Sequence, residues 1–234
     1  MLLIAARLDA QVPSEAEDLM ATFGNMSEQC CGDDDFSQTI FLAIPSEGPG
    51  NFYIRLFDPD CGGAHDLASG LWETNTVFEM YGGKGCLSEP DARMTSPVGN
   101  YRSGVLLERA LFARESAVDD TWITFGPFTP EEGEQLSIHP GYSFFKLIVE
   151  GQTGNDGNVY GIAISRAPGV NLDIDHAVHF EYERTHLSGS GVLTSREEIG
   201  LNAGEEVVLP LELDVLDVNT NPGQVIVEPV KKNQ

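Results

Sequence analysis

The residues best suited to chemistry lie in one acidic loop, Asp58-Pro59-Asp60-Cys61-Gly62-Gly63-Ala64-His65-Asp66. Carboxylates occupy its first, third and ninth positions, and a glycine occupies the sixth. Ca²⁺ needs several oxygens converging on one point, and a glycine lets the backbone turn sharply enough to bring them together. The loop departs from an EF-hand at position twelve, where Ser69 replaces glutamate. The spacing predicts a calcium site at Asp58, Asp60 and Asp66; alternatively, these acids only end a strand and bind turn amides.

Other acidic groups favour simpler interpretations. Asp33-Asp34-Asp35 and Asp119-Asp120 are expected to be solvated loop acids, with metal binding as the alternative. The segment Gly154–Asn158 contains Asp156-Gly157, and Asp-Gly is the dipeptide most typical of a two-residue hairpin turn. We therefore expect a turn there and no ligand.

Catalytic motifs are missing from the sequence. It contains no Gly-x-Ser-x-Gly elbow, no His-Glu-x-x-His and no phosphate-binding loop. Strand alternation could place His179, Glu181 and Glu183 on one side, where a carboxylate pair could hydrolyse glycosides. A solvated strand face is the favoured interpretation, so the sequence predicts a protein that is not an enzyme. The alternative is a sandwich-fold hydrolase that uses these acidic residues.

Four aromatic residues are candidates for a sugar-binding platform: Trp72, Tyr81, Trp122 and Tyr142. Aromatic side chains on strands more often belong to the core, because their burial removes a large apolar surface from water. A carbohydrate-binding module therefore stays an alternative function.

The four cysteines are Cys30, Cys31, Cys61 and Cys86, and none forms a Cys-x-x-Cys pair. Cys61 and Cys86 each follow an expected strand, so their loops could meet in a disulfide, which requires an oxidising compartment. A bridge within Cys30-Cys31 would be strained. The sequence thus predicts a Cys61–Cys86 disulfide, with a bridge within Cys30-Cys31 or from that pair to another segment as the alternative.

The charge balance excludes several classes of partner. Against 37 Asp and Glu there are only 13 Lys and Arg, which gives a formal net charge of -24. Nucleic acids and anionic membranes both require a basic surface, so neither is an expected partner. No stretch is long and apolar enough to insert into a membrane. The acid excess itself fits either cation binding or a solvated surface in a salty or extracellular medium.

Short strands separated by Gly and Pro turns recur along the chain and predict an all-β fold. The expected strands are 38–44, 51–57, 76–81, 104–114, 122–125, 144–150, 159–165, 179–184, 206–215 and 224–228. Residues 45–50 should form a hairpin, and 14–23 at most one short helix, with Ser14 as its cap. This pattern predicts a jelly-roll-like antiparallel β-sandwich in two units, residues 23–115 and 116–234. Residues 1–22 would precede them. Their apolar start predicts the tail of a signal peptide cleaved after Ala10, and a plain cytoplasmic start is the alternative.

Residues 35–60 resemble the opening of bacterial pre-peptidase C-terminal-type domains. The matching features are Asp35, the strand 39–44, Pro45-Ser46 and the Asp58-Pro59 pair that ends the next strand. Gly133-Glu134 and the segment 154–160 are loosely similar as well, so the resemblance covers about a third of the chain. It implies an extracellular sandwich domain that accompanies enzymes or surface proteins without catalysing a reaction, and it assigns no binding residues.

Together these patterns predict a secreted or cell-surface module for adhesion, ligand binding or spacing, with Ca²⁺ as a stabilising ion. Its partner would be an extracellular protein or a glycan.

Overall fold

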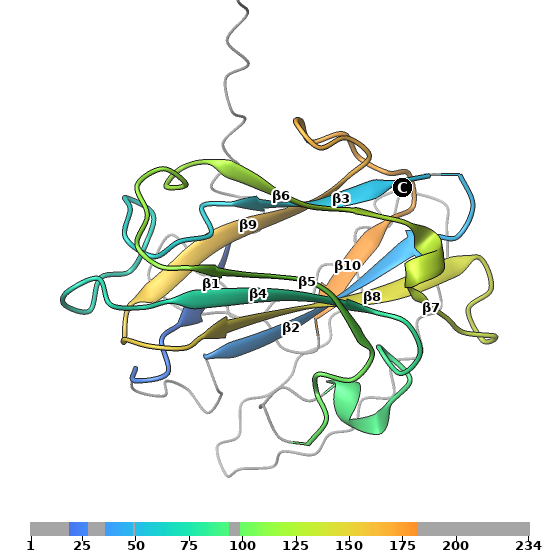
Figure 1. The fold of residues 1–234 in the computed structure, drawn as a ribbon, viewed down its shortest axis with the longest axis horizontal. Helices are drawn as coiled ribbons and strands as arrows, with labels where there is room; N and C mark the ends of the chain where they lie inside the picture. Colours follow the sequence, from blue (N-terminus) through green and yellow to red (C-terminus); the bar gives the residue numbers. More distant parts are fainter. Residues whose placement is uncertain (1–18, 28–35, 49, 94–98, 182–234) are drawn as a thin grey trace, which may run out of the picture. The chain divides into compact units, whose positions relative to one another are not determined.

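The computed structural model describes residues 19–27, 36–48, 50–93 and 99–181 of the 234-residue chain. Nearly all regular structure in this part is β-strand, and its two helical segments are the 3₁₀ turns Pro90–Arg93 (η1) and Pro130–Glu132 (η2). No helix among these residues has the length and apolar character needed to cross a bilayer. The strands are Leu19–Phe23 (β1), Ser37–Pro45 (β2), Phe52–Phe57 (β3), Thr76–Gly82 (β4), Val105–Phe112 (β5), Trp122–Phe128 (β6), Glu134–Gln135 (β7), Tyr142–Gly151 (β8), Gly157–Ser165 (β9) and Val178–Glu181 (β10) (Figure 1).

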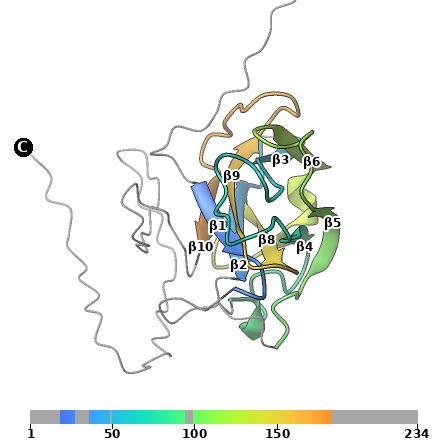
Figure 2. The same cartoon turned by 90° about the vertical axis from the view of Figure 1, so that its left-hand side faces the viewer.

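The strands form two antiparallel sheets that pack face to face (Figures 1 and 2). One sheet has the order β1-β9-β3-β6, and the other has the order β10-β2-β8-β4-β5, with β7 also paired to β8. The predicted all-β antiparallel sandwich is therefore confirmed.

Alternation along the strands places one set of side chains between the sheets. In β2, Ile40, Leu42 and Ile44 enter the central core, whereas Phe41 and Ala43 pack on the opposite face. Phe52 of one sheet meets Phe145 of the other edge to face, with ring centroids 5.0 Å apart. A two-residue side-chain period with apolar residues on both faces explains why these segments form strands with little exposed surface.

One segment predicted as helical is a strand in the structure. Leu19–Phe23 pairs with β9, from Leu19 opposite Gly161 to Phe23 opposite Gly157. Its Thr22 hydroxyl bonds the Tyr160 hydroxyl at 3.0 Å. Tertiary pairing and burial of Met20 and Ala21 outweigh the local capping signal. The ambiguous segment 104–114 contains β5, as the prediction favoured.

The connection at residues 45–50 is not a hairpin, because β2 and β3 belong to different sheets. Likewise β8 crosses to the other sheet before β9 begins, so Asp156-Gly157 is not a hairpin turn. In consequence β2 pairs with β8, and β3 pairs with β9.

These pairings also join the two halves of the sequence. Strands from both sides of residue 115 pair with one another in each sheet, so the described residues contain a single sandwich that is not divided at residue 115. β1 shows that part of the expected N-terminal segment belongs to the sandwich as well. The predicted signal-peptide tail and the strands at 206–215 and 224–228 lie outside the described residues.

Three connections gather at one end of the sandwich: residues 58–75 after β3, 113–121 before β6, and 152–156 between β8 and β9. This end, called the acidic end below, is at the left of Figure 1 and faces the viewer in Figure 2. It contains the acidic loop and Asp119-Asp120.

Candidate metal centre

Pairing of β3 with β6 brings the two acidic segments together. Phe57 lies opposite Trp122, and the next residue, Asp58, donates its backbone N–H to the Thr121 carbonyl at 3.1 Å. The acids that precede Trp122 therefore lie beside those that follow Phe57, although about sixty residues separate them in sequence. This register, which the sequence does not reveal, creates the candidate site.

Three carboxylates form the centre of the cluster. One ligand atom from each of Asp58, Asp119 and Asp120 lies within 4.8 Å of the others. Asp58 is fully buried, Asp119 is intermediate, and the side chain of Asp120 is 51% exposed. The cluster therefore runs from the interior of the acidic end to its surface.

Several oxygens of these acids have no hydrogen-bond partner despite being buried: Asp58 Oδ2, Asp60 Oδ1 and Asp119 Oδ1. The second oxygen of Asp58 accepts from the Asp120 N–H at 3.2 Å, and that of Asp60 accepts from the Glu115 N–H at 2.6 Å. Backbone N–H groups thus hold the carboxylates of Asp58 and Asp60 and leave one oxygen of each without a donor. A buried carboxylate oxygen without a donor is costly, so such atoms need an explanation.

The electrostatics show the same deficit of positive charge. Burial, followed by repulsion from Asp66, raises the pKa of Asp58 to about 7. Burial raises the pKa of Asp60 too, and the negative charge of Asp119 adds to it. Among the described residues, the ion pairs of Lys and Arg all involve Glu79 or Glu150. No lysine or arginine in that part of the chain forms an ion pair with the cluster, although the Arg114 side chain lies beside Gly62 of the acidic loop.

The backbone around the cluster is strained and tightly packed. Asp58 has φ 49° and Asp120 has φ 55°, two of the three non-glycine residues with positive φ in the described chain. Such conformations cluster at functional sites, where the surrounding structure enforces them. Gly63 lies so close to the cluster that an added Cβ would meet Asp119 Oδ1 at 1.9 Å. A side chain at this position would therefore displace the Asp119 carboxylate.

Asp66, the third predicted ligand, has a different role. Its Oδ2 accepts from the N–H groups of Gly62 and Gly63 at 2.6 and 3.0 Å, and its Oδ1 accepts from Val159 N–H at 2.7 Å. Both oxygens are thus occupied by the backbone. Asp66 ties the acidic loop to β9, whereas Asp58 and Asp60 keep free oxygens. Asp119 and Asp120, for which the sequence favours solvated loop acids, each place a carboxylate oxygen within 4.8 Å of Asp58 and could hold a metal with it.

Asp156 is a second structural carboxylate at this end. It is fully buried, and its two oxygens accept from the N–H groups of Ser69 and Glu73 at 2.8 and 2.9 Å. Its own N–H donates to Thr74 Oγ1 at 3.0 Å. Asp156 therefore anchors the 58–75 connection rather than forming the expected hairpin turn.

The predicted Cys61–Cys86 disulfide is wrong for this structure, in which both residues are buried free thiols. Pro59 contacts the start of β4 through Asn158, which donates to the Pro59 carbonyl and to Thr76 Oγ1. Cys86 follows the other end of β4. A seven-residue strand spans about 20 Å, several times the distance that a disulfide bridges. Cys30 and Cys31 lie outside the described residues.

The four candidate platform aromatics do not share a surface. Tyr81 is buried against Cys86 and Ile148, and Tyr142 packs on the outer-face cluster that contains Phe144. Trp72 and Trp122 are half-buried, and Trp122 alone of the four lies beside the acidic cluster in the β3–β6 pairing.

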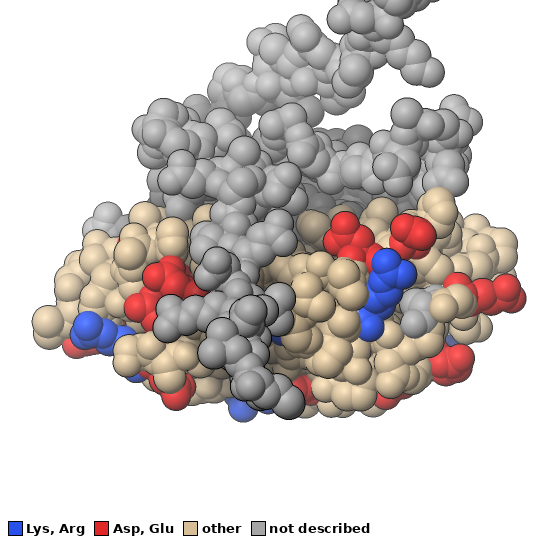
Figure 3. Space-filling model, turned by 90° about the horizontal axis from the view of Figure 1, so that it is seen from above, with Lys and Arg blue, Asp and Glu red and all other residues tan. Residues whose placement is uncertain are grey.

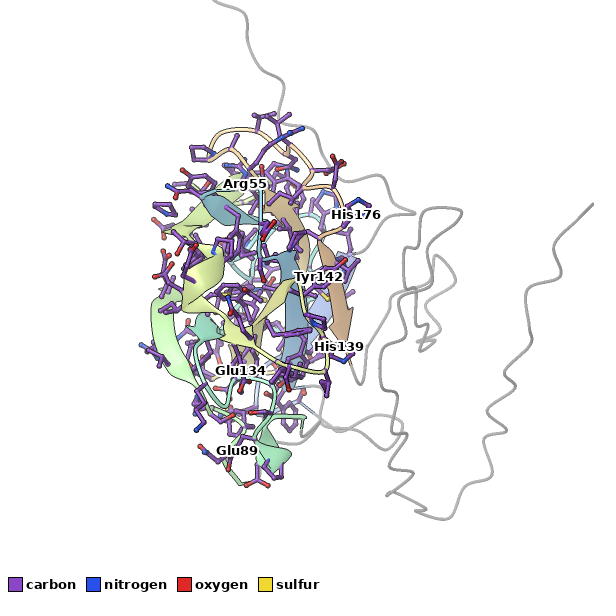
Figure 4. The ribbon with its side chains drawn as sticks, turned by 90° about the vertical axis from the view of Figure 1, so that its right-hand side faces the viewer. Arg55, Glu89, Glu134, His139, Tyr142 and His176 are labelled. Carbon is purple, nitrogen blue, oxygen red and sulfur yellow. The ribbon has the colours of Figure 1, made fainter. Side chains whose placement is uncertain are left out.

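A second set of buried carboxylates lies away from the acidic end, and all of its members have partners. Glu79 accepts from Arg102 Nε at 2.8 Å, Arg109 Nε at 2.9 Å and the Tyr81 hydroxyl at 2.9 Å. Glu134, labelled in Figure 4, accepts from the N–H groups of Gly85, Leu87 and Ser88 and from the Ser88 hydroxyl.

Burial alone would raise the pKa of both Glu79 and Glu134, but these hydrogen bonds outweigh it. The pKa of each carboxyl group is therefore below its usual value. Bonds to the charged form stabilise it, whereas Asp58 and Asp60 lack enough of them.

The residues of the predicted hydrolase face and of the 33–35 acidic segment form no site in the part of the chain that the structure describes. The main chain of β10 pairs His179 with Leu42 and Glu181 with Ile40, but the side chain of Glu181, Glu183 and residues 33–35 lie outside the described part. On the face in Figure 3, lysine and arginine side chains are few and separated, so this face has no continuous basic patch of the kind that nucleic acids require.

Comparison with protein-family models, with curated proteins and with solved structures gave no match to this chain. The acidic cluster is therefore the feature of the described residues that points most directly to a function.

Proposed function

We propose that the chain is a non-catalytic β-sandwich module of a secreted or cell-surface protein, and that Ca²⁺ stabilises it. The ion would bind Asp58, Asp60, Asp119 and Asp120 at the acidic end. One observation carries the proposal: adjacent buried carboxylates keep oxygens that no donor or basic side chain satisfies. A divalent cation supplies the missing positive charge and the missing contacts together.

The chemistry of the donors favours calcium over other metals. All four candidate ligands are carboxylates, and hard cations such as Ca²⁺ and Mg²⁺ prefer oxygen. Ca²⁺ accepts irregular geometry, which suits ligands from two separate loops. Calcium sites of extracellular modules bind in about the 0.1–1 mM range, so a Kd in that range would fit a location outside the cell.

The expected role of the ion is structural, because it would connect two loops of the acidic end. Asp58 and Asp60 belong to the connection after β3, and Asp119 and Asp120 to the connection before β6. A cation bound by both connections would remove their mutual repulsion and hold them together. Such a stiffened end would suit a module for adhesion or spacing.

Thermal unfolding with Ca²⁺ and with EDTA, at constant ionic strength, tests the proposal. Calcium at a hundredfold excess over its Kd should stabilise the protein by about 2.7 kcal/mol, because it binds only the folded form. The double variant Asp58→Asn with Asp60→Asn should lose this response.

A matched control changes Asp173→Asn and Asp175→Asn, two exposed acids with the same spacing. The control should keep the full calcium response. An unchanged midpoint for the wild-type protein in saturating calcium would refute the proposal.

A further inference from the structure

The solvent side of the acidic cluster is bordered by aromatic rings. His65 Nε2 lies 2.9 Å from Asp120 Oδ1, and the His65 side chain is 38% exposed. The His65 ring contacts Phe57 with centroids 6.1 Å apart, and Phe57 contacts Trp122 at 5.4 Å. A row of three rings therefore extends from the exposed member of the cluster along the outer face of β3 and β6.

The row has a fixed geometry. Arg55 lies over the Trp122 ring at 5.7 Å from its centroid, and it donates to Thr124 Oγ1 at 2.5 Å. Phe57 is fully buried beneath its neighbours, whereas His65 is exposed and Trp122 is half-buried. A ligand at the exposed edge of the cluster would therefore contact His65 and the exposed part of Trp122, but not Phe57. Both rings are already held in place, which reduces the entropy lost on binding.

A bound cation would leave coordination positions open on this side. Ca²⁺ takes about six to eight oxygens, and four carboxylates binding through one oxygen each would leave at least about two positions. The open positions would face solvent next to Asp120, because Asp58 is buried and Asp120 is the most exposed member of the cluster.

The local charge decides which ligand suits those positions. Four carboxylates and one divalent cation still carry a net negative charge, so an anionic ligand would be repelled. Neutral oxygens can complete the coordination without added repulsion. Two adjacent hydroxyl groups of a sugar supply such oxygens, and the apolar C–H face of a sugar ring packs against aromatic side chains.

We propose that the cation held by Asp58, Asp60, Asp119 and Asp120 also binds a neutral sugar through two adjacent hydroxyl groups, with the sugar ring against Trp122. This inference rests on the proposed function, because the sugar contacts the protein partly through the ion. It assigns the module a calcium-dependent glycan ligand and excludes acidic glycans as preferred ligands.

The test measures binding of the full chain to immobilised mannose, galactose and fucose, with sialylated glycans beside them, in Ca²⁺ and in EDTA. We expect at least one neutral sugar to be retained in Ca²⁺ only. Trp122→Ala should weaken that binding at least about tenfold, because stacking contacts of this size are lost, and should keep the calcium-induced rise in unfolding temperature.

Trp72→Ala is the matched control, since Trp72 is also half-buried at the acidic end but lies in the 58–75 connection. It should leave sugar binding within about twofold of wild type. Asp120→Asn should weaken both calcium binding and sugar binding.

The outcomes separate the inference from the proposed function. A calcium-induced rise in unfolding temperature without binding of any neutral sugar would overturn the inference and leave the calcium-stabilised module intact. Equal sugar binding in EDTA would also overturn it, because the ion would then take no part. Absence of any calcium effect on unfolding would overturn both.

Discussion

Two groups of buried carboxylates in this sandwich differ in how their charge is balanced. Glu134 and Glu79 accept three or more hydrogen bonds each from the protein, and each has a lowered pKa. Asp58 and Asp60 are buried to a similar degree, keep unpaired oxygens and have raised pKa values. Burial alone therefore does not identify a ligand site. The useful signal is a fixed carboxylate whose charge the protein itself does not satisfy.

The largest expected effect comes from removing a carboxylate that the protein does satisfy. Glu134→Ala would leave three backbone N–H groups and a hydroxyl without their acceptor, so the free energy of unfolding should fall by about 3 kcal/mol or more. Urea unfolding measures the change, and calcium should not reverse it. The control Glu131→Ala changes a neighbouring exposed glutamate and should alter stability by about 0.5 kcal/mol or less.

A smaller effect of opposite sign is expected at Asp58. Its pKa in the folded protein is raised to about 7, above the ordinary value of 3.8, so the folded state holds its proton more tightly than the unfolded state. Protonated Asp58 therefore stabilises the folded state fully below about pH 4, and this stabilisation is lost as the pH rises through about 7. Asp58→Asn keeps the neutral form at every pH. In EDTA, the free energy of unfolding of the variant relative to that of wild type should rise by about 1–2 kcal/mol as the pH increases from about 4 to about 7.

Urea unfolding of both proteins in EDTA from pH 4.5 to pH 8 measures this difference. Glu134 and Glu79 must give the reverse trend, because a lowered pKa adds stability that is lost as pH falls. If the difference in free energy of unfolding between wild type and Asp58→Asn stays constant over this pH range, then Asp58 does not differ from Glu134 and Glu79 in the way proposed.

The smallest effect on stability is expected at Gly63. An added methyl group there would meet Asp119 Oδ1, so Gly63→Ala should displace one ligand and weaken calcium binding about tenfold. Isothermal titration with Ca²⁺ measures the affinity, and unfolding in EDTA should change little. Gly70→Ala lies in the same connection with open space around it and should bind calcium like the wild type. Equal affinities for the two variants would exclude Asp119 as a ligand.

The sequence was sufficient to predict most strands, because 38–44, 51–57 and 144–150 are short segments rich in β-branched and aromatic residues. It was not sufficient for the connections. Pro and Gly between two strands favour a turn, but the same residues serve a hairpin and a crossing between sheets. For that reason the hairpin predicted at residues 45–50 is wrong, and this segment crosses between the sheets.

The candidate site was predicted in part for a related reason. Asp58 and Asp60 follow a clear strand with calcium-like spacing, whereas Asp119 and Asp120 join them only through the register of β3 with β6. Asp66 has the same residue type as the ligands, and only the structure shows that backbone amides occupy its oxygens.

The position of β8 and β9 has a consequence for synthesis on the ribosome. β8 lies between β2 and β4, and β9 lies between β1 and β3, so both sheets lack a central strand until residues 142–165 have been translated. A nascent chain of the first 140 residues therefore exposes strand edges that have no native partner. Folding must wait for these late residues, and during that interval the strong negative charge of the chain keeps neighbouring nascent chains apart.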